Sequence, residues 1–149
     1  MVKNLIILIL SFGASFGFGV GFHICGWKNL FFAGLGGLFT RAVYLLASAC
    51  ISQRFLFTMI ASFAASVYGE LMARKRKVPA AYFIYPSIIP LIPGDLFHYA
   101  ISAVIAGHAD DFRNYGLNCL IALLGLSIGM MLSSTTIKSI RKGVMEEDD

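Results

Sequence analysis

Two charged side chains stand in apolar sequence, where they could bind a charged solute. Arg41 lies inside the apolar run 30–51, and Asp95 directly follows the motif PLIPG at Pro90–Gly94. The planar guanidinium of arginine suits a carboxylate, because two of its N–H groups match the two carboxylate oxygens. Three interpretations of Arg41 stay open: it binds a substrate carboxylate, it pairs with Asp95 when no substrate is bound, or it is purely structural.

The backbone before Asp95 cannot form one regular helix. Pro86, Pro90 and Pro93 fall within eight residues, and each removes a backbone donor and clashes with the preceding turn. We therefore predict two half-helices, near 80–89 and 95–106. Broken backbone at membrane depth must be buried in protein or line a cavity, so Pro90, Pro93 and Gly94 are binding or coupling candidates. The alternative is a proline kink that only shapes packing.

Asp95 is placed to cap the second half-helix. His98 and Tyr99 follow it at i+3 and i+4, and Ser102 at i+7, so all share one helix face. The first interpretation is an aspartate that caps the helix and never titrates. The second is a substrate or proton site that includes His98 and Tyr99.

Glu70 ends a polar stripe that also contains Thr58, Ser62 and Ser66 at four-residue steps. Small residues beside this stripe favour helix packing with hydroxyl hydrogen bonds. Glu70 is a candidate coupling group, and the alternative is a simple pair with Arg74 one turn later.

No catalytic constellation appears in the sequence, which argues against an enzyme. There is no Ser/His/Asp spacing, no metal-ligand cluster and no phosphate-binding glycine loop after a strand. Two further patterns indicate helix packing at four-residue spacing: Gly13, Gly17 and Gly21, and Gly125, Gly129 and Ser133. Three isolated cysteines are predicted to be small buried apolar residues: Cys25, Cys50 and Cys119.

Composition sets the class of protein that must position these side chains. Hydrophobic residues make up 58% of the 149 positions and charged residues 13%, whereas a soluble domain has about a quarter charged. Mean hydropathy is +0.77. Five apolar runs reach the ~18 residues that cross a bilayer: 5–22, 30–51, 55–73, 78–106 and 117–137. The sequence predicts a single all-α integral membrane domain over 1–149 with five transmembrane helices, the fourth broken at the proline motif. The first run is predicted to be a retained transmembrane helix and not a cleaved signal peptide.

Basic residues predict the orientation of the spans. The RKRK run at 74–77 indicates a cytoplasmic connector, and Lys28, Lys138, Arg141 and Lys142 then fall on the same side. The N-terminus is therefore expected outside and the C-terminus inside. Because the basic residues are divided among loops at the lipid surface, the net charge of +4 does not indicate nucleic-acid binding. An odd number of spans favours half of an inverted-repeat transporter, with a partner or oligomerisation.

The motif at Pro90–Gly94 resembles the signature of the threonine/serine exporter family, in particular its short YjjB-like subunit. The segments 17–22 and 33–37 with Arg41 resemble the family's first hairpin. The segment 70–79 resembles its basic turn before the proline-rich span. The resemblance covers about residues 10–135.

The resemblance implies an exporter in the bacterial cytoplasmic (inner) membrane, with no cofactor. Its substrates would be small carboxylate-bearing metabolites such as threonine, serine or, in some members, succinate. It also implies a second, longer YjjP-like membrane subunit, or a homo-oligomer. The alternative is a membrane-embedded assembly or scaffold protein without its own transport activity. A polar cavity around 90–95 favours transport, and a dry core there favours a scaffold.

Overall fold

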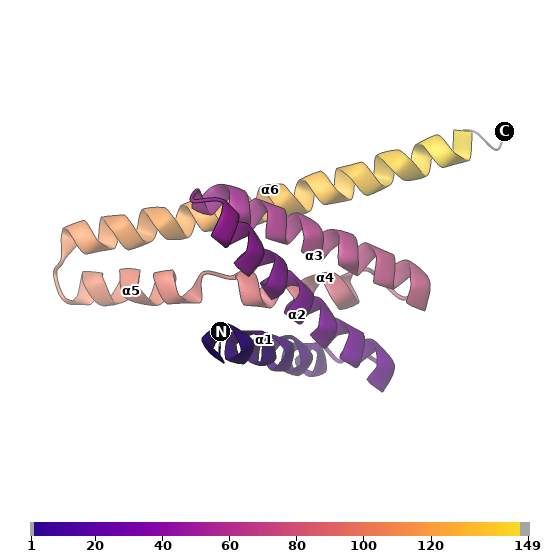
Figure 1. The fold of residues 1–149 in the computed structure, drawn as a ribbon, viewed down its shortest axis with the longest axis horizontal. Helices are drawn as coiled ribbons and strands as arrows, with labels where there is room; N and C mark the ends of the chain where they lie inside the picture. Colours follow the sequence, from indigo (N-terminus) through magenta and orange to yellow (C-terminus); the bar gives the residue numbers. More distant parts are fainter. Residues whose placement is uncertain (1, 147–149) are drawn as a thin grey trace.

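The computed structural model describes residues 2–146, and these fold into helices without strands (Figure 1). In chain order the elements are α1 (Val2–Gly21), α2 (Trp27–Cys50), α3 (Arg54–Arg76), α4 (Ala81–Ile88), the 3-10 helix η1 (Ile89–Leu91), α5 (Gly94–Ile105) and α6 (Ala109–Glu146). In this described part, α1, α2, α3 and α6 are each long and apolar enough to cross a membrane. The remaining helices make a fifth span when they are counted as one bent unit. The all-α membrane fold predicted from the sequence is therefore confirmed.

The fourth span is broken where the prolines fall. Pro86 lies inside α4, Pro90 inside η1, and Pro93 directly before α5. At Ile92 the backbone is extended, with ψ of 123°. The segments Ala81–Leu91 and Gly94–Ile105 consequently meet at a bend of 50°. The predicted pair of half-helices is confirmed.

Helices α3 and α6 run side by side in the same direction (Figure 1). A Cβ on Gly125 would lie 2.6 Å from the carbonyl oxygen of Phe55, and one on Gly129 would clash with the carbonyl oxygen of Met59. The hydroxyl of Ser62 donates a hydrogen bond to the carbonyl oxygen of Gly125 at 3.4 Å. These contacts confirm that Gly125 and Gly129 of α6 and Ser62 of the polar stripe of α3 serve helix packing.

The packing face of α1 differs from the prediction. A Cβ added to any of its three predicted packing glycines would meet nothing within 4 Å: Gly13, Gly17 and Gly21. The buried face of α1 instead runs through Ser11, Ser15 and Gly19. The predicted and the observed set both have four-residue spacing. Helix α2 packs on the set that contains Ser15, because Gly37 has no side chain and lets Ser15 approach the backbone of α2.

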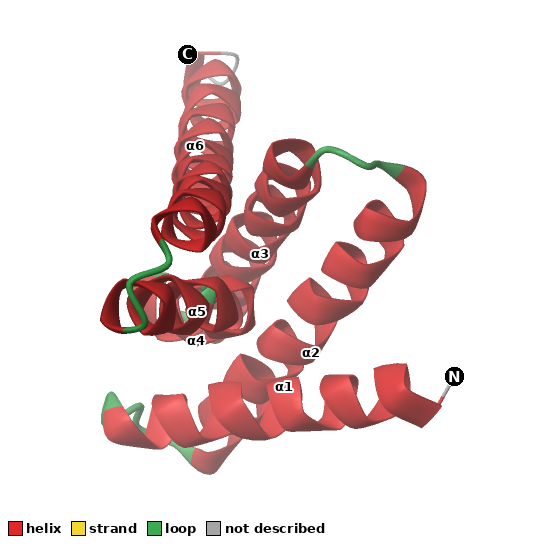
Figure 2. Cartoon of the chain, turned by 90° about the vertical axis from the view of Figure 1, so that its left-hand side faces the viewer, coloured by secondary structure: helices red, strands yellow, loops and turns green. Residues whose placement is uncertain are grey.

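The two ends of the bundle differ in charge and packing. Arg76 Nε donates to Asn29 Oδ1 at 2.9 Å, so the basic turn at 74–77 and the start of α2, with Lys28, lie at one end. Toward the opposite end, α5 and the first half of α6 form a hairpin that extends past the α2–α3 loop (Figures 1 and 2). Orientation across the bilayer stays a prediction. The side chains of Lys138, Arg141 and Lys142, and the tail 147–149, lie outside the described part.

The cysteine prediction holds at one of three positions. Cys119 is buried between α5 and α6, whereas Cys25 and Cys50 are exposed. Cys25 belongs to the loop after α1, and Cys50 is the last residue of α2, where no neighbouring helix covers it.

Candidate functional site

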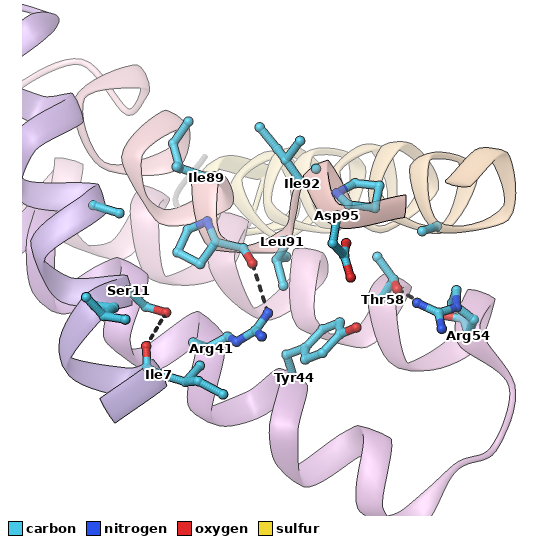
Figure 3. Close-up of a pocket in the computed structure, with 16 residues that line it drawn as sticks. Ile7, Ser11, Arg41, Tyr44, Arg54, Thr58, Ile89, Leu91, Ile92 and Asp95 are labelled. Atoms are coloured by element: carbon cyan, nitrogen blue, oxygen red, sulfur yellow. Dashed lines mark hydrogen bonds between the residues drawn. The ribbon is translucent and has the colours of Figure 1, made fainter. Parts of the chain in front are cut away.

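A cavity of about 480 Å³ lies beside the break in the fourth span. Its walls come from α1, α2, the start of α3, the segment 89–95 and one residue of α6 (Figure 3). The polar side chains that line it are Ser11, Arg41, Tyr44, Arg54, Thr58 and Asp95. The structure thus brings Arg41, Pro90, Pro93, Gly94 and Asp95 together, as the sequence predicts for one site.

Arg41 replaces a missing backbone donor at the break. In a continuous helix the Pro90 carbonyl would accept from the N–H of Gly94, but that N–H bonds the Ile92 carbonyl at 2.8 Å. Arg41 Nη1 donates to the Pro90 carbonyl oxygen instead, at 3.1 Å. A buried carbonyl without a donor costs about 1–3 kcal/mol, so this bond supports the broken backbone.

Within the described chain, only Nη1 of the Arg41 guanidinium forms a hydrogen bond. Its Cζ atom lies 4.8 Å from the centroid of the Tyr44 ring, a cation–π contact that holds the group over the cavity. Arg41 Nε is buried and has no hydrogen-bond partner within the described chain. The arginine is half-buried, and a buried donor of this kind is expected to find an acceptor.

Asp95 does not cap α5, contrary to the prediction. The helix begins at Gly94 and has Pro93 at its cap position, because Ile92 is extended and the first regular bond runs from the Phe97 N–H to the Pro93 carbonyl. Asp95 is therefore the second residue of the first turn, where its carboxylate interacts favourably with the helix dipole. Its carboxylate points into the cavity (Figure 3).

The ion pair between Arg41 and Asp95, one of the three interpretations of Arg41, is not formed. No salt bridge joins them in the described part of the chain. Arg41 is directed to the Pro90 carbonyl, while Asp95 faces the same space from the start of α5 (Figure 3). Opposite charges thus border one cavity with room between them, and Arg54 adds a second positive charge.

Three candidate residues lie away from this cavity. His98 and Tyr99 are exposed on α5 where it leaves the bundle, and the Tyr99 ring packs 5.5 Å from that of Tyr115 on α6. Glu70 lies 16 residues after Arg54, about 24 Å along α3. It lines two smaller cavities with Arg74 at the basic end, and the expected Glu70–Arg74 ion pair is not formed there.

Sequence reasoning missed four polar residues of the cavity as site candidates: Ser11, Tyr44, Arg54 and Thr58. Tyr44 follows Arg41 at i+3, so helical spacing is a usable signal for it. Thr58 belongs to the polar stripe, which is interpreted as a packing face. Arg54 lies between two apolar runs in the sequence, where it indicates only a charged connector. Nothing in the local sequence marks Ser11.

A broken, half-buried helix with charged side chains around a cavity is the arrangement found in multi-pass secondary transporters. Residues 7–136 match the model of a family described as threonine/serine exporter, ThrE. The chain therefore belongs to the threonine/serine exporter family, which confirms the resemblance seen in the sequence. It is a multi-pass membrane protein of the exporter class, consistent with the bacterial inner membrane. Comparisons with curated proteins and with solved structures gave no match.

Proposed function

We propose that this chain is one half of an inner-membrane exporter of small carboxylate-bearing metabolites, such as threonine, serine or succinate. The observation that carries the proposal is that Arg41 lines a cavity at the helix break while, within the described chain, only the Nη1 atom of its guanidinium is hydrogen-bonded. An arginine at membrane depth costs about 2.5–3.5 kcal/mol on insertion scales. One hydrogen bond to a carbonyl offsets only part of that cost, whereas a bound carboxylate would neutralise the charge.

The start of α5 supports the same kind of ligand. Gly94 and Asp95 form the first turn of this helix and line the cavity, so its positive dipole end lies beside Arg41. Arg54 adds a second cation. The net local charge from two arginines and one aspartate is positive, which favours a solute with at least one carboxylate. Asp95 supplies a hydrogen-bond acceptor for the ammonium group of an amino acid.

A second, longer membrane subunit, or further copies of this chain, would complete the pathway. Helix α5 packs mainly on α6, and its large side chains at Phe97, Ile101 and Val104 are exposed. The glycine stripe of α1 is also uncovered. Lipid or another helix can cover such surfaces, but five spans enclose little interior. A scaffold role would need a dry core at the break, and the charged cavity weighs against it.

Co-expression with the product of the neighbouring gene tests this function. Export would be followed for a panel of amino acids and dicarboxylates, with vector-only cells as the baseline. The proposal predicts export of at least one carboxylate-bearing solute that requires Arg41. Export of uncharged solutes alone, or none with the protein verified in the membrane, would contradict it.

A further inference from the structure

Three hydroxyl groups are fully buried and unpartnered where α1, α2 and α4 meet. Ser15, Thr40 and Ser87 each have 0% exposure, and their side-chain oxygens have no hydrogen-bond partner in the described chain. Such groups are rare in proteins. Hydroxyls on the same helices can bond the preceding turn, as Ser11 does to the Ile7 carbonyl at 2.8 Å. Burial alone therefore does not explain the three.

The hydroxyls gather around two adjacent glycines of α2. Ser87, from α4, lies where a Cβ on Gly36 would be, and Ser15, from α1, lies where a Cβ on Gly37 would be. Thr40 follows these glycines by three to four residues, on the same face of α2. We call this group of Ser15, Gly36, Gly37, Thr40 and Ser87 the hydroxyl seam. It brings three helices into close contact, and the ring of Tyr68 from α3 also reaches Gly36.

The hydroxyl seam continues the cavity toward the basic end of the bundle. Ser15 lies one turn beyond the cavity residue Ser11 on α1, and Gly37 lies one turn before Arg41 on α2. Ser87, near the end of α4, lies two residues before the cavity residue Ile89 of η1. On each of these elements, the direction from the cavity to the seam residue leads toward the end of the bundle that carries the turn at 74–77. The positive-inside rule places that end in the cytoplasm. Farther in that direction, Ala33 and Phe83 close the core at 0% exposure.

We propose that the hydroxyl seam is the cytoplasmic part of the solute pathway, closed in this conformation. When α1 and α4 separate from α2, Ser15, Thr40 and Ser87 hydrogen-bond water and then the passing solute. Separation exposes less apolar surface here than a leucine-packed contact would, because α1 and α4 each contact α2 through a serine on a glycine. Pro86, next to Ser87, removes one helical hydrogen bond and so weakens α4 at this point. This inference rests on the proposed transport function.

Cysteine accessibility tests the inference. Ser87→Cys and Ser15→Cys would be made separately in the full chain, co-expressed with its neighbour, after the native cysteines are replaced. The control is Ser133→Cys, because Ser133 is equally buried and unpartnered but follows Gly129 on the α6 face that packs on α3. A membrane-impermeant thiol reagent would be added to inside-out vesicles, with and without threonine or succinate.

The inference predicts that both seam cysteines react about tenfold faster than the control, because the seam opens and the α3–α6 interface does not. It also predicts that solute changes their rate. If both react as slowly as Ser133→Cys under every condition, the inference is wrong. Cysteine labelling can be measured whether or not solute is exported. It therefore tests the hydroxyl seam separately from the proposed transport function. Reactive cysteines without carboxylate export contradict only the proposed substrate, whereas robust export with protected cysteines places the pathway elsewhere.

Discussion

Arg41 donates a hydrogen bond to the carbonyl oxygen of Pro90 across 3.1 Å, from α2 to the broken span. The same side chain therefore supports the break in the backbone and supplies one of the two positive charges of the cavity. A solute bound to this guanidinium would act directly on the segment where the two half-helices meet.

Replacing Arg41 with lysine separates charge from geometry. Arg41→Lys keeps a positive charge but loses the planar fork, so we expect export to fall about tenfold or more while membrane levels stay near normal. The measurement is initial export rate, normalised to membrane protein on a blot. Arg113→Lys is the matched control, since Arg113 is exposed on α6 outside the cavity. Equal rates for both variants would show that Arg41 is structural.

Replacing Asp95 with asparagine tests whether its carboxylate takes part in transport. Asp95 makes no side-chain hydrogen bond to cap α5, so Asp95→Asn removes only its interaction with the helix dipole and should cost about 0.3–1 kcal/mol of stability. If the carboxylate contacts the solute, export should fall about tenfold or more while membrane levels on a blot stay near normal. Asp110→Asn, in the first turn of α6, is the control, because it removes the same charge outside the cavity. Equal export rates for the two variants would show that the Asp95 carboxylate is not required.

Two glycine substitutions test which glycine stripe packs inside the chain. Gly129→Ala places a Cβ against the carbonyl oxygen of Met59 and should cost about 1–3 kcal/mol through overpacking. Gly17→Ala meets nothing within 4 Å and should leave thermal stability of the isolated chain in detergent unchanged or slightly higher. Comparable melting temperatures for both variants would contradict the assigned helix faces.

Orientation can be read by labelling from the periplasm. A cysteine at Asn114, near the start of α6, should react with an impermeant reagent, and one at Lys75 should not. Both positions are exposed, so accessibility depends on the side of the membrane. The reverse pattern would invert the predicted topology.

Reconstitution tests the need for a partner. The purified chain alone, in liposomes, should give no solute flux above that of empty vesicles, because five short spans leave the cavity incompletely enclosed. Strong flux from the lone chain would contradict the two-part system.

Run length and hydropathy predicted the spans well, because a helix that crosses the hydrocarbon core must be both long enough and apolar. The run at 55–73 became α3, Arg54–Arg76, and the proline spacing located the break. Helix α6 starts at Ala109, eight residues before the predicted run at 117, because polar Asp110 and Asp111 suit a helix N-terminus without adding hydropathy.

The site was only partly predictable. Residue type alone identified Arg41 and the proline motif as site candidates, since a charge and a broken helix are both costly in lipid. Whether Arg41 meets a carboxylate or a carbonyl depends on how the chain turns at Ile92, which no residue type specifies. Similarly, two sets of small residues on α1 have the same spacing, and only the position of α2 selects Ser15 over Gly17.

Helix α6 has 38 residues, or about 57 Å, nearly twice the ~30 Å thickness of a hydrocarbon core. Because α3 packs closely along part of it, we expect the two helices to move together as one stiff unit. A tilt of about 10° of a rod this long moves its far end by about 10 Å. Small changes in angle inside the membrane are thus converted into large displacements in water, where a single fluorophore pair could measure them.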